Sequence, residues 1–359
     1  MDKKRIFILG AGFSKAAGYP LNNELIRNII NEKVLGREVE KLSRMKTKMD
    51  INDLDFDEVL HSVEEYRKKD NSLYVEKYLR WYQENNKNVA MGFLRLMYWY
   101  FWHLRNNLEV PRYVQFFTHY LLRPDDVIIS FNYDLLIEKA FINPRKEFDE
   151  RGIIGRDIEY NQKTIAHPML LKPHGSINWL IGLQPEDEIT EGAPGTPVSR
   201  RKKRLMKESH VLLWQENNKY IWEAEIYFQL PVQEKNSISP LIKWWFPASD
   251  QVSDYDWKEY DGYFKEIWWK SIEELKTAKQ IFVIGFAFNE YDSQVRENII
   301  NSIKKETEII VVSSDSSEKV ANFFIKHGFT NVKYNIGELS RIENWVIAGL
   351  DPYIKKVLY

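Results

Sequence analysis

Four short apolar runs stand out along the chain, and each is bounded by polar residues or glycine. They are Arg5–Leu9, Val127–Ser130, Gln280–Ile284 and Glu308–Ser313. Their nearly continuous hydrophobicity is typical of parallel strands that are covered on both faces. A helix-like stretch at about Tyr291–Lys305 separates the last two runs. This alternation of strand and helix predicts an α/β fold built on an open, mostly parallel sheet.

The segment between the first two strands follows a different pattern. Residues 22–122 contain almost no glycine or proline and carry apolar residues at helical spacing, as in "VEKYLRWYQ". We predict a helical subdomain over 22–122, inserted in or packed on the sheet, and a sheet domain made of 1–21 and 123–359. The run "MYWYFWHL" could be an aromatic ligand box, but a buried helix is the simpler interpretation.

Residues 183–250 form a less regular insertion in the predicted sheet domain. The stretch "QPEDEITEGAPGTPVSRRKKR" is first acidic, then rich in glycine and proline, then basic, which is typical of loops. The basic run "RRKKR" could contact phosphate or a partner. A solvated surface turn explains it equally simply, and we prefer that interpretation.

Composition narrows the class of protein. A chain of 359 residues is long enough for two domains, or for one domain with a large insertion. It contains no cysteine, which fits a reducing compartment and excludes a cysteine-ligated zinc site. The net charge of -1 argues against broad electrostatic binding to nucleic acid. No apolar run is long enough for a membrane span or a signal peptide, so we expect a cytoplasmic protein without membrane contact.

The first strand runs into "GAGFSKAAGYP", a glycine turn followed by a helix-like stretch, which is how a chain approaches a nucleotide phosphate. Gly10 and Gly12 fit the first two glycines of a dehydrogenase fingerprint, but Lys15 occupies the third position. No second strand ending in an acidic residue follows, although a dehydrogenase needs one to bind the ribose. The sequence therefore argues against hydride transfer.

Three further motifs follow later strands. "SFNYD" contains Asn132 and Asp134, "KPHGSINW" contains His174, and "VIGFAFNEYD" contains Gly285. The carboxyl ends of parallel strands meet at one edge of a sheet, so we expect these motifs around one crevice. Taken singly, Asn132 could be a helix N-cap and His174 a structural histidine.

In this order, the four motifs resemble the sirtuin-like family, and in particular its bacterial branch of NAD-consuming anti-phage defence proteins. The resemblance covers about residues 5–334 and implies a Rossmann-like sheet that binds NAD at its carboxyl edge. It implies Asn132 and His174 as catalytic residues, with Asn132 holding the nicotinamide ribose or the attacking water and His174 acting as the base. The NAD-binding positions that it implies are Gly10, Ala11, Gly12, Ser14, Asp134, Gly285 and Ser313.

The departures from the family pattern are informative. The family's protein deacylases carry a zinc module of four cysteines, and they have Asp-Phe-Arg where this chain has Leu21, Asn22 and Asn23 after Pro20. Both departures argue against peptide deacylation and leave NAD cleavage intact. We therefore expect an NAD+ glycohydrolase that uses NAD+ as a substrate, without zinc, and that releases nicotinamide and ADP-ribose.

The resemblance also implies a cellular setting. We expect a defence effector gated by homo-oligomerisation or by a partner protein such as an ATPase, a nuclease or an Argonaute-like protein. Two alternatives stay open: a catalytically silent sensor of NAD or ADP-ribose derivatives, and an ADP-ribosyltransferase. The sequence leaves undecided the trigger, the preference between NAD and NADP, and whether the product is linear or cyclic.

Overall fold

The computed structural model describes thirteen stretches of the chain: 4–30, 56–71, 74–75, 77–79, 81, 87–142, 168–181, 210–216, 219–224, 239–242, 261–288, 293–313 and 317–336.

Six strands form the main sheet in the order β10, β9, β8, β1, β2, β3, and every pairing is parallel. Their bounds are β1 Arg5–Leu9, β2 Val127–Ser130, β3 Met169–Leu171, β8 Gln280–Ile284, β9 Glu308–Ser313 and β10 Val332–Ile336. The predicted α/β class with a Rossmann-like, mostly parallel sheet is confirmed. The four predicted strands occur with the predicted bounds, and β3 and β10 are additions that the hydrophobic pattern did not indicate.

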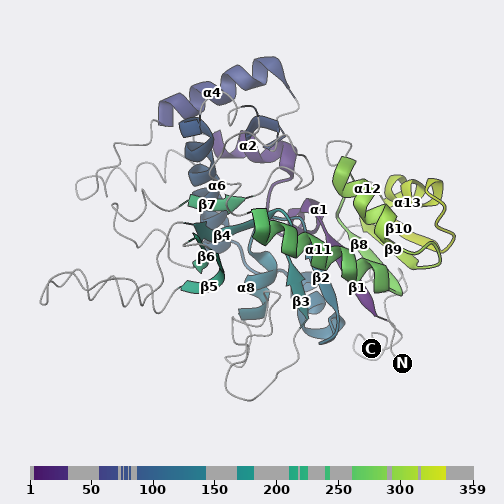
Figure 1. The fold of residues 1–359 in the computed structure, drawn as a ribbon. Helices are drawn as coiled ribbons and strands as arrows, with labels where there is room; N and C mark the ends of the chain where they lie inside the picture. Colours follow the sequence, from purple (N-terminus) through teal and green to yellow (C-terminus); the bar gives the residue numbers. More distant parts are fainter. Residues whose placement is uncertain are drawn as a thin grey trace, which may run out of the picture.

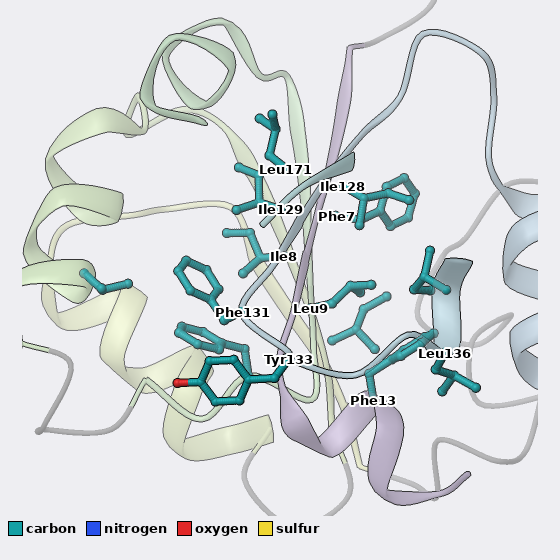
Figure 2. Packing of buried hydrophobic residues seen from close by; sticks show 14 of the residues in the cluster. Phe7, Ile8, Leu9, Phe13, Ile128, Ile129, Phe131, Tyr133, Leu136 and Leu171 are labelled. Atoms are coloured by element: carbon teal, nitrogen blue, oxygen red, sulfur yellow. The ribbon is translucent and has the colours of Figure 1, made fainter. Parts of the chain in front are cut away.

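The central strand shows why continuous apolar runs become strands here. All five residues of β1 are buried, so the strand needs apolar side chains on both faces. The ring of Phe7 stacks on Phe282 of β8, with 4.7 Å between ring centroids, and meets Phe117 edge-on at 5.3 Å. Figure 2 shows this core continuing along β1 and β2 to Phe131 and Tyr133, where β2 has ended.

The strand order changes direction at β1. The chain adds β2 and β3 on one side of β1 and then returns to add β8, β9 and β10 on the other side. In open α/β sheets, ligands bind at the carboxyl ends of the strands at such a switch point. The topology therefore directs attention to the loops that follow β1, β2 and β8.

Helices surround the sheet. They are α1 Ala11–Lys15, α2 Asn22–Ile30, α4 Phe56–Lys69, α6 Lys87–Asn107, α7 Arg112–Phe116, the π-helix η1 Phe117–Leu121, α8 Leu136–Ile142, α11 Asp261–Thr277, α12 Ser293–Ser302 and α13 Ser317–Lys326. Figure 1 shows α2, α4 and α6 gathered at one end of the molecule, with α12 and α13 beside β8, β9 and β10. None of the helices that the structure describes is long and apolar enough to cross a membrane.

The described part of the predicted insertion is mostly helical. The helices α2, α4, α6 and α7 and the π-helix η1 all fall between β1 and β2 in the sequence. In the run "MYWYFWHL", Met97, Tyr100 and Phe101 are buried, as expected for a packed helix. The division into domains at 21 and 122 stays a prediction, because these helices share one hydrophobic core with the sheet.

A second, antiparallel sheet is formed by strands that lie between β3 and β8 in the sequence. It has the order β5, β6, β4, β7, with bounds β4 Gly175–Ile181, β5 His210–Glu216, β6 Lys219–Ala224 and β7 Ser239–Ile242. Three of these strands fall in the segment 183–250 that we expected to be irregular. The charged and proline-rich residues around them mask the short apolar stretches "VLLW" and "YIW". The basic run 200–204 lies outside the described residues.

Candidate functional site

A cavity of about 360 Å³ lies at the carboxyl edge of the main sheet. Eight of the nine predicted site residues line it, although they come from five separate segments of the chain. These residues are Gly10, Ala11, Gly12, Asn132, Asp134, His174, Gly285 and Ser313. The ninth, Ser14, does not line the cavity but hydrogen-bonds to Asn132, which does. Among the described lining residues, Asp134 is the one with a carboxyl group, and none is lysine or arginine.

The glycines bring two backbone loops into contact beneath the cavity. A Cβ atom on Gly10 would lie 2.5 Å from the Cα of Phe286, and one on Gly12 would lie 2.9 Å from the Cα of Gly285. Gly285 has a φ of +61°, and its own Cβ would lie 2.1 Å from the backbone nitrogen of Phe13. Only glycine permits both this conformation and this approach. The loops after β1 and β8 therefore pack tightly against each other and together form one side of the cavity.

Three backbone N–H groups directly after β1 already donate hydrogen bonds to carbonyl groups of this packed region. The Gly12 N–H donates to the Gly285 carbonyl at 2.9 Å, and the Phe13 N–H donates to the Gly10 carbonyl at 2.9 Å. The Gly10 N–H donates to the carbonyl of Ile284 at 3.0 Å. In the structure, the glycines thus allow the two backbones to pack closely. This packing places the main chain at the cavity wall.

Asn132 joins the loop after β2 to the loop after β1. Its side-chain Nδ2 donates to the Gly10 carbonyl at 3.0 Å and to Ser14 Oγ at 3.1 Å. The other amide atom, Oδ1, is buried and has no hydrogen-bonding partner in the described part of the chain. A buried acceptor without a partner is costly, so such atoms are found where a site needs a polar contact. The Asn132 amide is held by one end, and its carbonyl oxygen is available for a polar contact.

Asp134 lies next to this amide in the same loop. Its Oδ1 accepts the Leu136 N–H at 3.0 Å at the start of α8, which is a typical capping contact. The Ser14 hydroxyl accepts from Asn132 and donates to the Asp134 carboxylate, so Ser14 bridges the two side chains. Burial raises the pKa of Asp134, and Lys172, Leu136 and Ser14 offset this rise only in part.

His174 reaches the cavity from the turn between β3 and β4. The Gly175 N–H donates to the Lys172 carbonyl at 2.9 Å, and Gly175 has a φ of +81°, so a tight turn holds the histidine. The imidazole meets the ring of Phe131 edge-on, with 5.1 Å between ring centroids, and lies nearly parallel to the ring of Tyr133 at 6.3 Å. Residues on both sides of Asn132 therefore contact the histidine.

Ser313 closes the cavity at the end of β9. Its N–H donates to Ser317 Oγ at 2.8 Å, and the same hydroxyl donates back to the Ser313 carbonyl at 2.7 Å. Beside it, Phe286 stacks on Phe131, with 4.7 Å between ring centroids, and meets Phe288 edge-on. Phe288 has a φ of +50°, which is uncommon for a bulky residue. This part of the cavity is walled by aromatic rings.

Twelve lining residues were not among the predicted site residues. They are Pro20, Leu21, Asn22, Asn23, Leu25, Tyr74, Phe101, Phe131, Tyr133, Phe286, Ala287 and Phe288. Five of them flank Asn132 or follow Gly285 and could have been found from their adjacency to the motifs. Tyr74 and Phe101 reach the cavity from the helical insertion, and no local pattern marks Tyr74. Phe101 belongs to the run "MYWYFWHL", for which the sequence offered an aromatic ligand box beside the preferred buried helix, and it is both buried and part of the cavity wall.

The described residues contain no group of three or more histidine, aspartate or glutamate side chains placed to hold a metal ion. The polar side chains among the described lining residues are therefore three amides, one carboxyl group, one imidazole and three hydroxyl groups, those of Asn22, Asn23, Asn132, Asp134, His174, Tyr74, Tyr133 and Ser313.

Comparison with known proteins bears on this part of the chain. Residues 126–213 match the model of the SIR2-like domain. No curated protein matches the chain. The matched segment contains Asn132, Asp134 and His174, which meet at the cavity. The resemblance to the sirtuin-like family is thus confirmed over residues 126–213, and the anti-phage defence branch stays a prediction.

Solved structures of Sir2 proteins are also similar to the chain. A Sir2 homologue in complex with NAD is 13% identical, with 100% of this chain and 92% of that chain covered and a TM-score of 0.38. A structure described as the basis for the mechanism and regulation of Sir2 enzymes is 12% identical, with 99% and 94% covered and a TM-score of 0.41. Because both TM-scores lie below 0.5, the fold rests on the observed strand order and pairing.

Proposed function

We propose that this protein is an NAD+ glycohydrolase, which cleaves NAD+ to nicotinamide and ADP-ribose. The SIR2-like match over residues 126–213 supports an NAD-dependent activity of the sirtuin type. The single observation that carries the proposal is the convergence of Asn132, Asp134 and His174 on one cavity. Each side chain belongs to a loop at the carboxyl edge of the sheet, where dinucleotides bind in open α/β folds.

The bond to be broken requires little acid catalysis. It joins the ribose C1′ to a positively charged ring nitrogen, so nicotinamide leaves as a neutral amine. Ordinary glycosidases need a carboxylic acid to protonate the leaving group, and this reaction does not. The site has to hold a water molecule on one face of the sugar, stabilise an oxocarbenium-like centre and accept one proton.

The side chains at the cavity suit these tasks. We assign Asn132 to hold the water or the ribose hydroxyls, because its Oδ1 is buried without a partner in the described part of the chain. His174 is the base, since an imidazole can accept a proton near neutral pH. Asp134 would accept the N–H of the nicotinamide carboxamide. A positioned base contributes about a hundredfold to ten-thousandfold in rate.

The remaining predicted residues would line the rest of the dinucleotide. Gly10, Ala11 and Gly12 would pass beside the pyrophosphate, while Gly285 and Ser313 would lie on the adenosine side. Ser14 would act on the substrate through Asn132, to which it is hydrogen-bonded at 3.1 Å.

We further propose that the activity serves anti-phage defence, as the family resemblance suggests. Uncontrolled hydrolysis would drain the NAD of its own cell. We therefore expect the enzyme to be gated by a homo-oligomer or by a defence-system partner protein.

The test is to incubate the purified protein with NAD+ and to identify the products by chromatography and mass spectrometry. Equal amounts of nicotinamide and ADP-ribose are the expected result. NAD+ that binds without turnover would replace the proposal with a silent sensor. Label from tagged NAD+ on a macromolecule would replace it with an ADP-ribosyltransferase.

A further inference from the structure

A buried ion pair lies directly behind the loop that holds Asn132 and Asp134. The ammonium group of Lys172 is 2.8 Å from Glu138 Oε1, and both side chains are buried, at 3% and 10% exposure. Lys172 directly follows β3 and begins the turn that carries His174, whereas Glu138 lies in α8. Neither residue lines the cavity.

The three donors of this ammonium group are all used. Besides Glu138, Lys172 Nζ donates to the backbone carbonyl of Asp134 at 2.8 Å and to Ser176 Oγ at 2.7 Å. The Ser176 hydroxyl in turn donates a hydrogen bond to Asn178 Oδ1 at 2.7 Å. One cation therefore connects the loop after β2, the helix α8 and the start of β4.

The backbone around Lys172 strengthens the same connection. Its carbonyl accepts the Gly175 N–H of the turn that carries His174. Two residues further on, the Ile177 N–H donates to the Tyr133 carbonyl at 3.1 Å. Consecutive carbonyl groups, those of Tyr133 and Asp134, are thus both held by the segment 172–177.

We propose that Lys172 is a positioning residue, which fixes the Asn132–Asp134 loop relative to the His174 turn. The inference rests on the proposed function, because its kinetic consequence is the alignment of Asn132 and His174 on one substrate. An error of about 1 Å in such an alignment can cost about a hundredfold in rate.

Lys172 also sets the charge that surrounds Asp134. The groups that face this carboxyl are Lys172 from the β3–β4 turn, Glu138 from α8, the Ser14 hydroxyl from α1, and the phenols of Tyr19 and Tyr113. Burial raises the pKa of both phenols, so they remain neutral. Lys172 gives the largest of the effects that lower the pKa of Asp134. Its removal raises that pKa further.

The first variants are Lys172→Met, which keeps the length of the side chain without donors or charge, and the double variant Lys172→Met/Glu138→Leu. The single variant leaves Glu138 buried and unpaired, which can prevent folding. The double variant removes both charges and is expected to fold, since an apolar pair often replaces a buried ion pair without loss of stability.

Three readouts distinguish positioning from a general structural role. In the double variant we expect nicotinamide release to fall about a hundredfold in kcat, with a much smaller change in KM. The acidic limb of the pH–rate profile should move to higher pH, because Lys172 lowers the pKa of Asp134 more than Glu138 raises it. Amide hydrogen exchange at Ile177, relative to a core amide such as that of Val283, should accelerate at least about tenfold.

The matched control is the double variant Arg5→Met/Asp126→Leu. Arg5 and Asp126 form an equally buried pair, at 3% and 1% exposure, at the opposite edge of the sheet. This variant should fold and should leave the pH profile and the relative exchange at Ile177 unchanged. Unchanged exchange at Ile177 in the double variant, or a pH profile and kcat like those of the wild type, would overturn the inference. If the wild type releases no nicotinamide, the proposed function fails, and the exchange measurement alone still decides this inference.

Discussion

The side-chain amide of Asn132 donates a hydrogen bond to the hydroxyl of Ser14, with 3.1 Å between the two atoms. The two residues are 118 positions apart in the sequence and follow neighbouring strands of the sheet. Ser14 in turn donates to the carboxylate of Asp134. This chain of hydrogen bonds leaves Asn132 Oδ1, the atom proposed to contact the substrate, at a fixed place beside the cavity.

Replacing Ser14 with alanine should therefore disturb the site more than the fold. Ser14→Ala removes the acceptor of the Asn132 amide and a donor to Asp134, so we expect nicotinamide release to fall about tenfold to a hundredfold. The free energy of unfolding should fall by about 1–3 kcal/mol.

Ser62→Ala is the matched control for this substitution. Ser62 is an equally buried serine of α4, and its hydroxyl lies 2.7 Å from Tyr78 OH, away from the cavity lining. Chemical denaturation should give similar losses for both variants, and only Ser14→Ala should slow the reaction. Equal rates in the two variants would show that the contact is purely structural.

The close approach of the loops after β1 and β8 makes Gly285 difficult to replace. Gly285→Ala would place its Cβ 2.1 Å from the nitrogen of Phe13, on a backbone with a φ of +61°. We expect a loss of about 4 kcal/mol or more in the free energy of unfolding, or no folded protein.

Gly328→Ala separates the two causes of the loss expected at Gly285, which are the steric clash of the new Cβ and the strain of the backbone. Gly328 has a φ of +85°, and no described atom lies within 4 Å of its added Cβ. The backbone strain alone should cost about 1–2 kcal/mol. Urea denaturation of both variants checks the comparison, and similar losses would contradict the close packing of Gly285 against the Gly12–Phe13 backbone.

The raised pKa of Asp134 predicts how stability depends on pH. A carboxyl group whose pKa is raised on folding binds its proton more tightly in the folded protein. Its stabilising contribution is complete below the unfolded pKa, close to 3.8, and is lost as the pH rises through the folded pKa. Asp134→Asn keeps an oxygen for the Leu136 N–H but has no such loss.

The free energy of unfolding of Asp134→Asn, relative to the wild type, should thus increase as the pH rises above about 4 and then level off above the folded pKa. Urea denaturation between pH 4 and pH 8 measures this difference, and groups such as Asp126 cancel because both proteins contain them. If the stability of Asp134→Asn relative to the wild type decreased with pH instead, the effect of Lys172 on the pKa of Asp134 would be larger than that of burial.

The strands that the sequence predicts are those whose surroundings are apolar on both faces. β1, β2, β8 and β9 have the expected bounds because every position in them is buried or nearly so. β10 was not predicted because it is the edge strand, and its Lys333 and Tyr334 are exposed. The strand β3 has three residues and is too short to produce a pattern.

The site residues also divide into those that the sequence predicted and those that it did not. Polar residues directly after predicted strands were found, because parallel strands bring their carboxyl ends together. Tyr74 was not found, and Phe101 was named only within a run for which a buried helix was preferred, because the place of both at the cavity depends on how the helical insertion packs on the sheet. The contact of Lys172 with the Asp134 carbonyl involves the main chain of a distant loop, which has no signature in the sequence.

The central claim is that Asn132 and His174 act together on bound NAD+. The most direct measurement is the rate of nicotinamide release from NAD+ by the wild type, Asn132→Ala and His174→Ala, each at the condition in which the wild type is fastest. We predict release by the wild type and a loss of about a hundredfold or more in each variant, with folding retained. Variants as fast as the wild type, or a wild type that is silent under every activating condition, would contradict the account.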